Sequence, residues 1–175
     1  MDILNYKINS KEYIFEMFIN KTKKPKVILS VNYNGKVLWK RNFKDTIIEE
    51  IKSLYLIKKE LFCSINNTIY KIDINNGNII KKKSFGNTPI EEIIISKNCI
   101  FILLYYFEFN KQKYLSNILC IDNNLNIKWY AELEADDIYT NLIERKENII
   151  GITWNGWTCV LNKNTGKIMR KKFTK

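Results

Sequence analysis

The sequence contains no histidine among its 175 residues. Histidine is the commonest general base in enzymes and the commonest metal ligand. Its absence excludes serine and cysteine nucleophiles that a histidine would activate. The chain also has no P-loop, G-x-S-x-G or G-x-G-x-x-G motif. We therefore expect a protein that is not an enzyme and that holds neither a metal nor a cofactor.

Cysteine is scarce, and its spacing is uninformative for metal binding. The four cysteines are Cys63, Cys99, Cys120 and Cys159, and none of them forms a C-x-x-C pair. Zinc ribbons and knuckles place their cysteines in such pairs. Two interpretations remain open. One is four buried, reduced and slowly reacting thiols, which we favour, and the other is a zinc site on which all four converge.

Long apolar runs are also missing. The longest, near Cys99–Phe107, has the length of a strand, whereas roughly 18 apolar residues are needed to cross a bilayer. The first residues, Met1–Asn5, lack the basic start and the apolar stretch of a signal peptide. From these two features we expect a cytoplasmic protein.

What the sequence does contain is a fourfold repeat. Each copy is an alternating apolar run, a turn rich in Asn, Asp and Gly, and a second alternating run, which predicts a β-hairpin. The copies are Val27–Phe43, Thr68–Phe85, Ser116–Leu133 and Trp157–Phe173. Asn34-Gly35, Asn76-Gly77 and Gly166 supply residues that tolerate a positive φ. Asn124-Leu125 departs from this pattern, and there we expect a three-residue turn that uses Asn.

The residues before each hairpin repeat as well, so each unit holds four strands, A to D. The unit ends are Phe43, Phe85, Leu133 and about Phe173, with spacings of 42, 48 and 40 residues. A propeller blade repeats about every 40–50 residues. The sequence predicts an all-β, four-bladed β-propeller as a single domain, with blades at residues 1–43, 44–85, 86–133 and 134–175. An alternative is half of an eight-bladed propeller that a homodimer would complete.

Tryptophan in the last strand of two units carries a family resemblance. Trp39 and Trp129 each stand four residues after the turn position, at Gly35 and Leu125. With Asp73-Ile-Asn-Asn-Gly77, this pattern resembles the repeat of the PQQ-like, quinoprotein-type β-propellers. The resemblance implies four-stranded blades around a central axis. It does not imply the quinone, because the chain matches no ligand set of those enzymes.

The formal net charge is +11, and blade one contributes most of it. Nine basic and three acidic residues lie in residues 1–43. Four of the basic residues flank Pro25 in the long connection between strands B and C: Lys21, Lys23, Lys24 and Lys26. The long connection between strands B and C in blade three carries Phe107, Phe109, Lys111, Lys113 and Tyr114. The charge either attracts an anionic partner or reflects a genome that favours lysine, asparagine and isoleucine codons.

Two further sets of charged residues recur from blade to blade. The turn between strands A and B carries a lysine in every unit: Lys11, Lys59, Lys97 and Lys146. Acidic pairs lie at or just before strand A in three units: Glu49-Glu50, Glu91-Glu92 and Asp136-Asp137. The lysines form either an anion-binding ring or, as we favour, ordinary polar turns. The acidic pairs form either a cation-binding ring or, as we favour, loop charges and strand-end caps.

We expect the long B–C connections of blades one and three to form a partner-binding face. Trp154 and Trp157 lie on either side of the short B–C turn of blade four and would lie on the same face. The predicted contact residues are Lys23, Lys24, Lys26, Phe109, Lys111, Lys113, Tyr114, Trp154 and Trp157. Aromatic anchors with a basic rim suit another protein with an acidic surface.

The expected function is therefore a non-catalytic, cytoplasmic protein-binding scaffold, for which a toxin-neutralising immunity protein is one example. The alternative is a binder of nucleic acid or another polyanion through the basic surface. We expect no membrane association.

Overall fold

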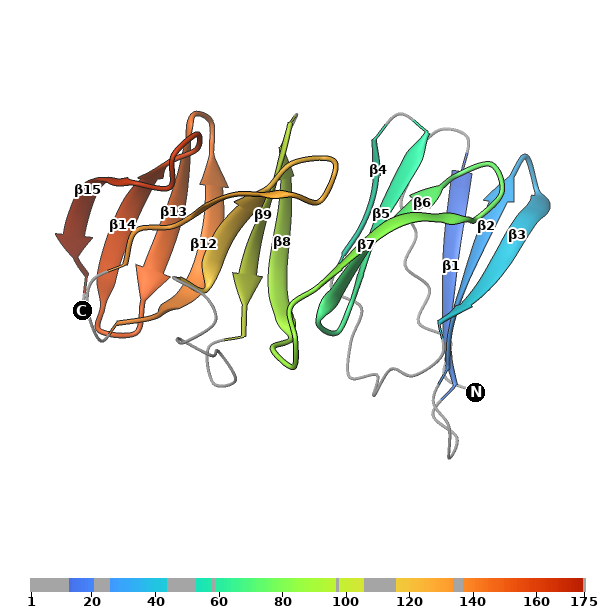
Figure 1. The fold of residues 1–175 in the computed structure, drawn as a ribbon, viewed down its shortest axis with the longest axis horizontal. Coiled ribbons are helices and arrows are strands. Elements are labelled where there is room, and N and C mark those ends of the chain that lie inside the picture. Colours follow the sequence, from blue (N-terminus) through green and yellow to red (C-terminus); the bar gives the residue numbers. More distant parts are fainter. Residues whose placement is uncertain are drawn as a thin grey trace. The chain divides into compact units, whose positions relative to one another are not determined.

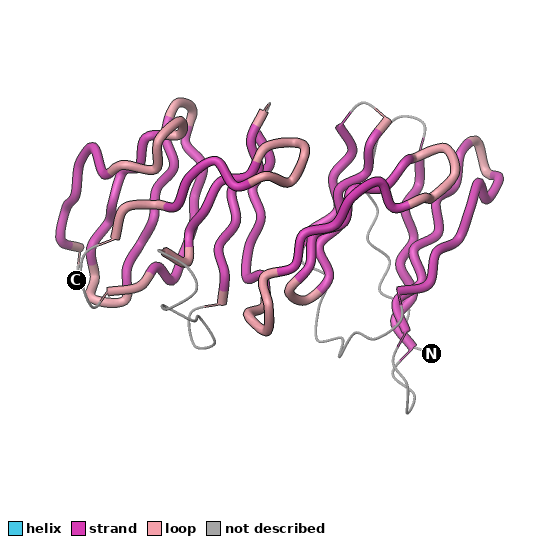
Figure 2. The backbone as a smooth tube through the Cα atoms, viewed as in Figure 1, coloured by secondary structure: helices cyan, strands magenta, loops and turns pink. Residues whose placement is uncertain are grey.

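The computed structural model describes residues 13–20, 26–43, 53–57, 59–96, 98–105, 116–133 and 137–174, with only the backbone described for 13–28 and 53. This part of the chain holds fifteen β-strands and no helix (Figures 1 and 2). No membrane-spanning helix is found in the segments described. The strands form four separate antiparallel sheets, and each sheet consists of consecutive strands. We call each sheet a blade.

The first two blades occupy the N-terminal half. Blade one has the order β1-β2-β3, with β1 Tyr13–Asn20, β2 Lys26–Tyr33 and β3 Lys36–Phe43. Blade two has the order β4-β5-β6-β7, with β4 Ser53–Ile57, β5 Glu60–Ile65, β6 Thr68–Asp73 and β7 Ile79–Ser84. The three strands of blade one are B, C and D of the predicted repeat. Its strand A would fall within residues 1–12, outside the described part.

The last two blades follow the same scheme. Blade three consists of β8 Ile90–Ser96, β9 Cys99–Leu104, β10 Ile118–Ile121 and β11 Ile127–Tyr130. Blade four consists of β12 Tyr139–Arg145, β13 Asn148–Thr153, β14 Trp157–Asn162 and β15 Ile168–Phe173. All four predicted hairpins are present, with register pairs such as Val27↔Phe43 and Trp157↔Phe173. The prediction of four strands, A to D, is thus confirmed in three blades.

The C–D turns use positive φ where the sequence pattern predicts it. Asn34 and Gly35 have φ of 49° and 74°, which is the backbone of a tight hairpin turn. Gly77 and Gly166, both at 72°, take the corresponding place in blades two and four. In blade three the residue with positive φ is Leu125, at 60°, and not an asparagine. Leu125 is buried, so packing of its side chain offsets a backbone strain of about 1–2 kcal/mol.

The chain divides into two units, Met1–Ser84 and Phe85–Lys175, and each has its own core. In the first unit, buried side chains of blade one, such as Leu29 and Val31, pack with Leu61 and Ile72 of blade two. In the second unit, Phe101 and Ile118 of blade three pack with Leu142, Cys159 and other residues of blade four.

In each unit a tryptophan from the outer strand of one blade packs on the C–D turn of the next. The indole N–H of Trp39 donates to the Ile74 carbonyl at 2.7 Å, and its ring lies against Gly77. The indole N–H of Trp129 donates to the Lys163 carbonyl at 3.1 Å, and its ring lies against Gly166. A Cβ on either glycine would stand 2.5 Å from the ring, so both positions need glycine for space as well as for φ. Lys81 and Arg170 occupy the tryptophan position in the other two blades.

Within the second unit, the side chain of Asn117 forms hydrogen bonds with both blade three and blade four. Its buried side-chain amide donates to the carbonyls of Leu104 and Tyr139, at 3.1 and 2.7 Å. Its side-chain oxygen accepts a hydrogen bond from the Tyr139 N–H at 3.0 Å. One asparagine therefore satisfies polar groups at the end of β9 and at the start of β12.

Candidate functional site

The B–C turn of blade four is held in place from three sides. Gly156, with φ of 90°, donates to the Thr153 carbonyl at 3.1 Å. The Asp137 carboxylate accepts from the N–H groups of Ile138 and Asn155, at 2.8 and 3.3 Å. Thr174, after β15, donates through its N–H to the Gly156 carbonyl at 2.9 Å. The turn therefore presents its two tryptophans on a fixed backbone.

Around this turn lie aromatic and basic side chains. Trp157 meets Phe173, its cross-strand partner on β15, with ring centroids 5.2 Å apart in an edge-to-face arrangement. The Lys171 ammonium stands 4.9 Å from the centre of the Trp157 ring, within range of a cation–π contact. Trp154 and Phe173 are 54% and 51% exposed. We call Trp154, Trp157, Lys171 and Phe173 the blade-four surface.

A small pocket opens beneath Trp157. Its lining residues are Leu133, Asp137, Tyr139, Thr153, Trp157, Cys159, Ile168 and Lys171. The space that a water-sized sphere can occupy is about 10 Å³, which is room for roughly one water. Pockets that bind small molecules measure about 300–1,000 Å³. The pocket therefore suits packing or one ordered water better than a metabolite.

The ionisable groups around the pocket have structural partners. The Tyr139 hydroxyl donates to the Glu132 carbonyl at 2.5 Å. Burial, reinforced by the neighbouring Cys159, raises the pKa of the Tyr139 hydroxyl far above its ordinary value. The hydroxyl therefore stays protonated at neutral pH and acts as a hydrogen-bond donor.

Only part of the predicted binding face falls within the described residues. Trp154 and Trp157 do, and the structure brings Trp157 together with Phe173 and Lys171. Lys26 begins β2, and its side chain is not described. The other predicted contact residues lie outside the described part: Lys23, Lys24, Phe109, Lys111, Lys113 and Tyr114. Their role in binding stays a prediction.

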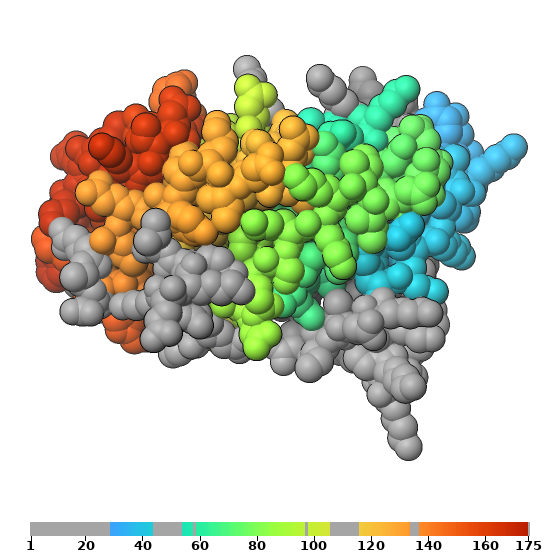
Figure 3. Space-filling model, in the orientation of Figure 1, coloured from blue at the N-terminus to red at the C-terminus, as the bar shows by residue number. Residues whose placement is uncertain are grey.

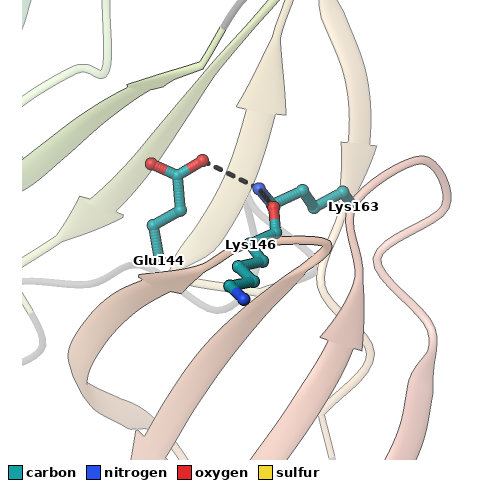
Figure 4. A network of polar contacts seen from close by, with 3 residues as sticks. All are labelled: Glu144, Lys146 and Lys163. Carbon is teal, nitrogen blue, oxygen red and sulfur yellow. Dashed lines mark hydrogen bonds and ion pairs between the residues drawn. The ribbon is translucent and has the colours of Figure 1, made fainter.

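The recurrent A–B lysines can be followed in two blades. Lys59 and Lys146 are exposed, whereas Lys11 and Lys97 lie outside the described residues. In blade four, the Lys163 ammonium pairs with the Glu144 carboxylate at 2.8 Å and donates to the Lys146 carbonyl at 2.5 Å. The Lys146 ammonium points away from this pair (Figure 4). This turn therefore uses the backbone of Lys146 for its structure.

The acidic pairs differ from one another. Glu91 and Glu92 are half-buried on β8. Burial raises the pKa of Glu92, a hydrogen bond from the Leu142 backbone lowers it, and the Glu91 charge raises it. Asp137 caps the turn of blade four, as described above. Glu49, Glu50 and Asp136 lie outside the described residues, and in the segments described no three metal-binding side chains gather.

The thiols are largely buried. Cys63, Cys120 and Cys159 lie in the cores, and Cys99 is half-buried. Burial raises the pKa of Cys63 to about 12 and that of Cys120 far above its ordinary value. The Lys128 ammonium stands 3.6 Å from the Cys99 sulfur. We therefore expect Cys99 to react before the other three.

Sequence reasoning missed the outermost strands. Runs of cations occupy β7 and β15, and Lys171 on β15 completes the blade-four surface. The signal was present in the Lys81-Lys82-Lys83 and Arg170-Lys171-Lys172 runs. A net charge summed over each blade hides these runs, because each blade also contains acidic residues outside its last strand.

A family model described as "Domain of unknown function (DUF7957)" matches residues 86–173, half of the chain. The chain belongs to this family. The DUF7957 match contains blades three and four, and with them the blade-four surface. No curated protein matches the chain in sequence.

Several solved structures resemble the DUF7957 chain in fold. The computationally designed Ika8 protein has a TM-score of 0.58 at 12% identity, over 96% of this chain and 61% of Ika8. BamB from Moraxella catarrhalis has a TM-score of 0.55 at 11% identity, over 90% of this chain and 60% of BamB. The Pan2 WD40 domain of Neurospora crassa has a TM-score of 0.54 at 14% identity, over 98% of this chain and 48% of that chain.

BamB and the WD40 domain are β-propellers, so the likeness confirms the predicted propeller fold. At these identities it shows the fold alone. The chain spans about three fifths of Ika8 and BamB and about half of the Pan2 domain.

Proposed function

We propose that this chain is a non-catalytic protein-binding module, and that the blade-four surface is one of its contacts. The observation that carries this proposal is the cluster of Trp157 with Lys171 and the exposed Phe173 of β15, beside the hydrogen-bonded turn that carries the exposed Trp154. Tryptophan, tyrosine and arginine supply most of the binding energy of protein interfaces, and charges at the rim speed encounter. Trp154 and Phe173 offer large apolar area, and Lys171 favours an acidic partner surface.

The absence of histidine from the whole chain supports a binding role over an enzymatic one. Neutralising a toxin, as bacterial immunity proteins do, is one use of such a module in the cytoplasm. The long B–C connections of blades one and three would extend the contact. Binding of nucleic acid through the basic surface is the alternative.

The experiment places a photo-crosslinking amino acid at position 154 of the full chain in its native host. The matched control places it at position 143, where Ile143 is exposed on β12 of the same unit. We expect a crosslinked protein from position 154 and none from 143. The proposal would be contradicted if both positions captured the same proteins, or if position 154 captured none.

Binding kinetics with the captured protein then test the residues. Trp154→Ala and Phe173→Ala should each weaken binding about tenfold or more, mainly through faster dissociation. Ile143→Ala should change it less than about twofold. A different result would favour the alternative of a purely electrostatic contact, as in nucleic-acid binding. In that case added salt would weaken binding, and neither aromatic substitution would change it.

A further inference from the structure

Nearly all the net positive charge lies on the outermost strands of the blades. β3, β7 and β15 each contain three basic residues, β11 contains one, and none of the four contains an acidic residue. The rest of the chain has nineteen basic and eighteen acidic residues, from totals of 29 and 18. The last strand of each sheet in chain order therefore carries basic residues and no acidic ones, whereas basic and acidic residues nearly balance over the rest of the chain.

Three of these strands share one pattern at equivalent positions. In β7, the aliphatic pair Ile79-Ile80 precedes Lys81-Lys82-Lys83. Ile168-Met169 precedes Arg170-Lys171-Lys172 in β15. In β3, Val37-Leu38 precedes Trp39-Lys40-Arg41. Each strand thus presents an aliphatic pair and then cations.

The second blade shows this arrangement most fully. β7 pairs with β6 along one side and ends its sheet on the other. Ile79 and Ile80 are 36% and 52% exposed, and Lys82 is exposed. The segment that contains β7, coloured green, lies on the visible surface in Figure 3. Among the described strands none pairs with the outer edge of β7, and most of its side chains are exposed.

Protection against aggregation explains only half of the pattern. Lysines on a sheet edge prevent two copies from pairing, because like charges would then stand opposite one another. Exposed isoleucines on the same edge act in the opposite direction, since they favour pairing. The combination rejects a second copy of this chain but accepts a strand with acids opposite the lysines.

We propose that the outer edge of β7 binds an extended acidic segment of another protein by strand addition. The β7 backbone would supply ladder hydrogen bonds, Lys82 and Lys83 would meet carboxylates, and Ile79 and Ile80 would meet apolar side chains. Nucleic acid fits less well, because bases stack on aromatic rings and β7 has no aromatic side chain. β7 shares no residue with the blade-four surface, so the proposal does not depend on the proposed function.

The test uses the full chain and a synthetic eight-residue peptide of four glutamates followed by four valines, blocked at both ends. The two blocks are needed because neighbouring strand residues face opposite sides, and Lys82-Lys83 and Ile79-Ile80 are each neighbours. Three probes serve as comparisons: the same peptide with alternate backbone nitrogens methylated, its lysine–valine counterpart, and an oligothymidine of similar charge. We expect the glutamate–valine peptide to bind and to slow amide hydrogen exchange in β7. Backbone methylation should weaken binding at least tenfold, because strand addition needs the N–H donors.

A matched pair of variants tests the location. Lys82→Glu with Lys83→Glu should abolish the slowed exchange in β7. Lys59→Glu with Lys146→Glu changes the net charge equally, on exposed turn lysines, and should leave that exchange slowed. Trp154→Ala should also leave peptide binding unchanged.

Several outcomes would overturn the proposal. They are equal binding of the methylated peptide, tighter binding of oligothymidine than of the acidic peptide, slowed exchange outside the outer strands, and no binding of the acidic peptide. All four are measured on the unaltered protein, so they hold even if a variant fails to fold.

Discussion

At the scale of single residues, a glycine can be required for its φ, for space, or for both. Gly35 and Gly77 separate these requirements because their φ values nearly coincide, at 74° and 72°. Nothing lies within 4 Å of a Cβ built on Gly35, whereas one built on Gly77 meets the Trp39 ring at 2.5 Å. The two positions form a natural matched pair within one unit.

We predict that Gly35→Ala lowers the free energy of unfolding by about 1 kcal/mol, the strain of a left-handed alanine. Gly77→Ala should lower it by about 3 kcal/mol, because displacing the hydrogen-bonded Trp39 ring adds an overpacking term of about 1–3 kcal/mol. Urea denaturation of both variants measures the difference. If both substitutions lowered the free energy of unfolding equally, the Trp39 ring would be able to move aside at no cost in free energy.

At the scale of elements, burial changes from the inner strands to the outer strands of each blade. β5 and β9 are buried along almost their whole length, whereas β7 and β15 are exposed along almost theirs. The buried strands read as continuous apolar runs, as strands covered on both faces do. Apolar side chains of blades three and four pack in one core, and Asn117, just before β10, adds hydrogen bonds between the two blades.

Asn117→Ala should lower the free energy of unfolding by about 2–4 kcal/mol. It removes three buried hydrogen bonds and leaves backbone groups of Leu104 and Tyr139 without that partner. Asn124→Ala, at an exposed turn position of the same blade, should change the value by less than about 0.5 kcal/mol. Thermal unfolding followed by circular dichroism compares the two. Similar melting temperatures for both variants would contradict the role given to Asn117.

At the scale of the whole molecule, repulsion between the basic outer strands should keep copies apart. The net charge is +11 at neutral pH and vanishes near the sequence pI of about 9.4. We predict that light scattering rises as the pH approaches 9.4, because association is favoured when net charge is lost. The Lys82→Glu and Lys83→Glu variant should reach its scattering maximum at lower pH. Scattering that stays flat through pH 9.4 would show that other forces keep the chain monodisperse.

The sequence by itself determined the local elements of this protein. Alternating apolar runs and Asn-Gly turns specify hairpins within a few residues, so the four C–D hairpins and the A–D division of blades two to four followed from it. Two of the predicted contact residues, Trp154 and Trp157, also lie together because one short turn joins them.

Tertiary structure decided the contacts between residues distant in the chain. Trp39 reaches the Ile74 carbonyl 35 residues away, and Asn117 reaches Tyr139 22 residues away. Trp129 reaches the Lys163 carbonyl of the next blade, 34 residues away. The residue pattern of one strand fixes which side chains share a face, but it does not say which neighbour covers that face. Only the packing of one blade on the next determines that, because each long-range contact depends on the geometry of both partners.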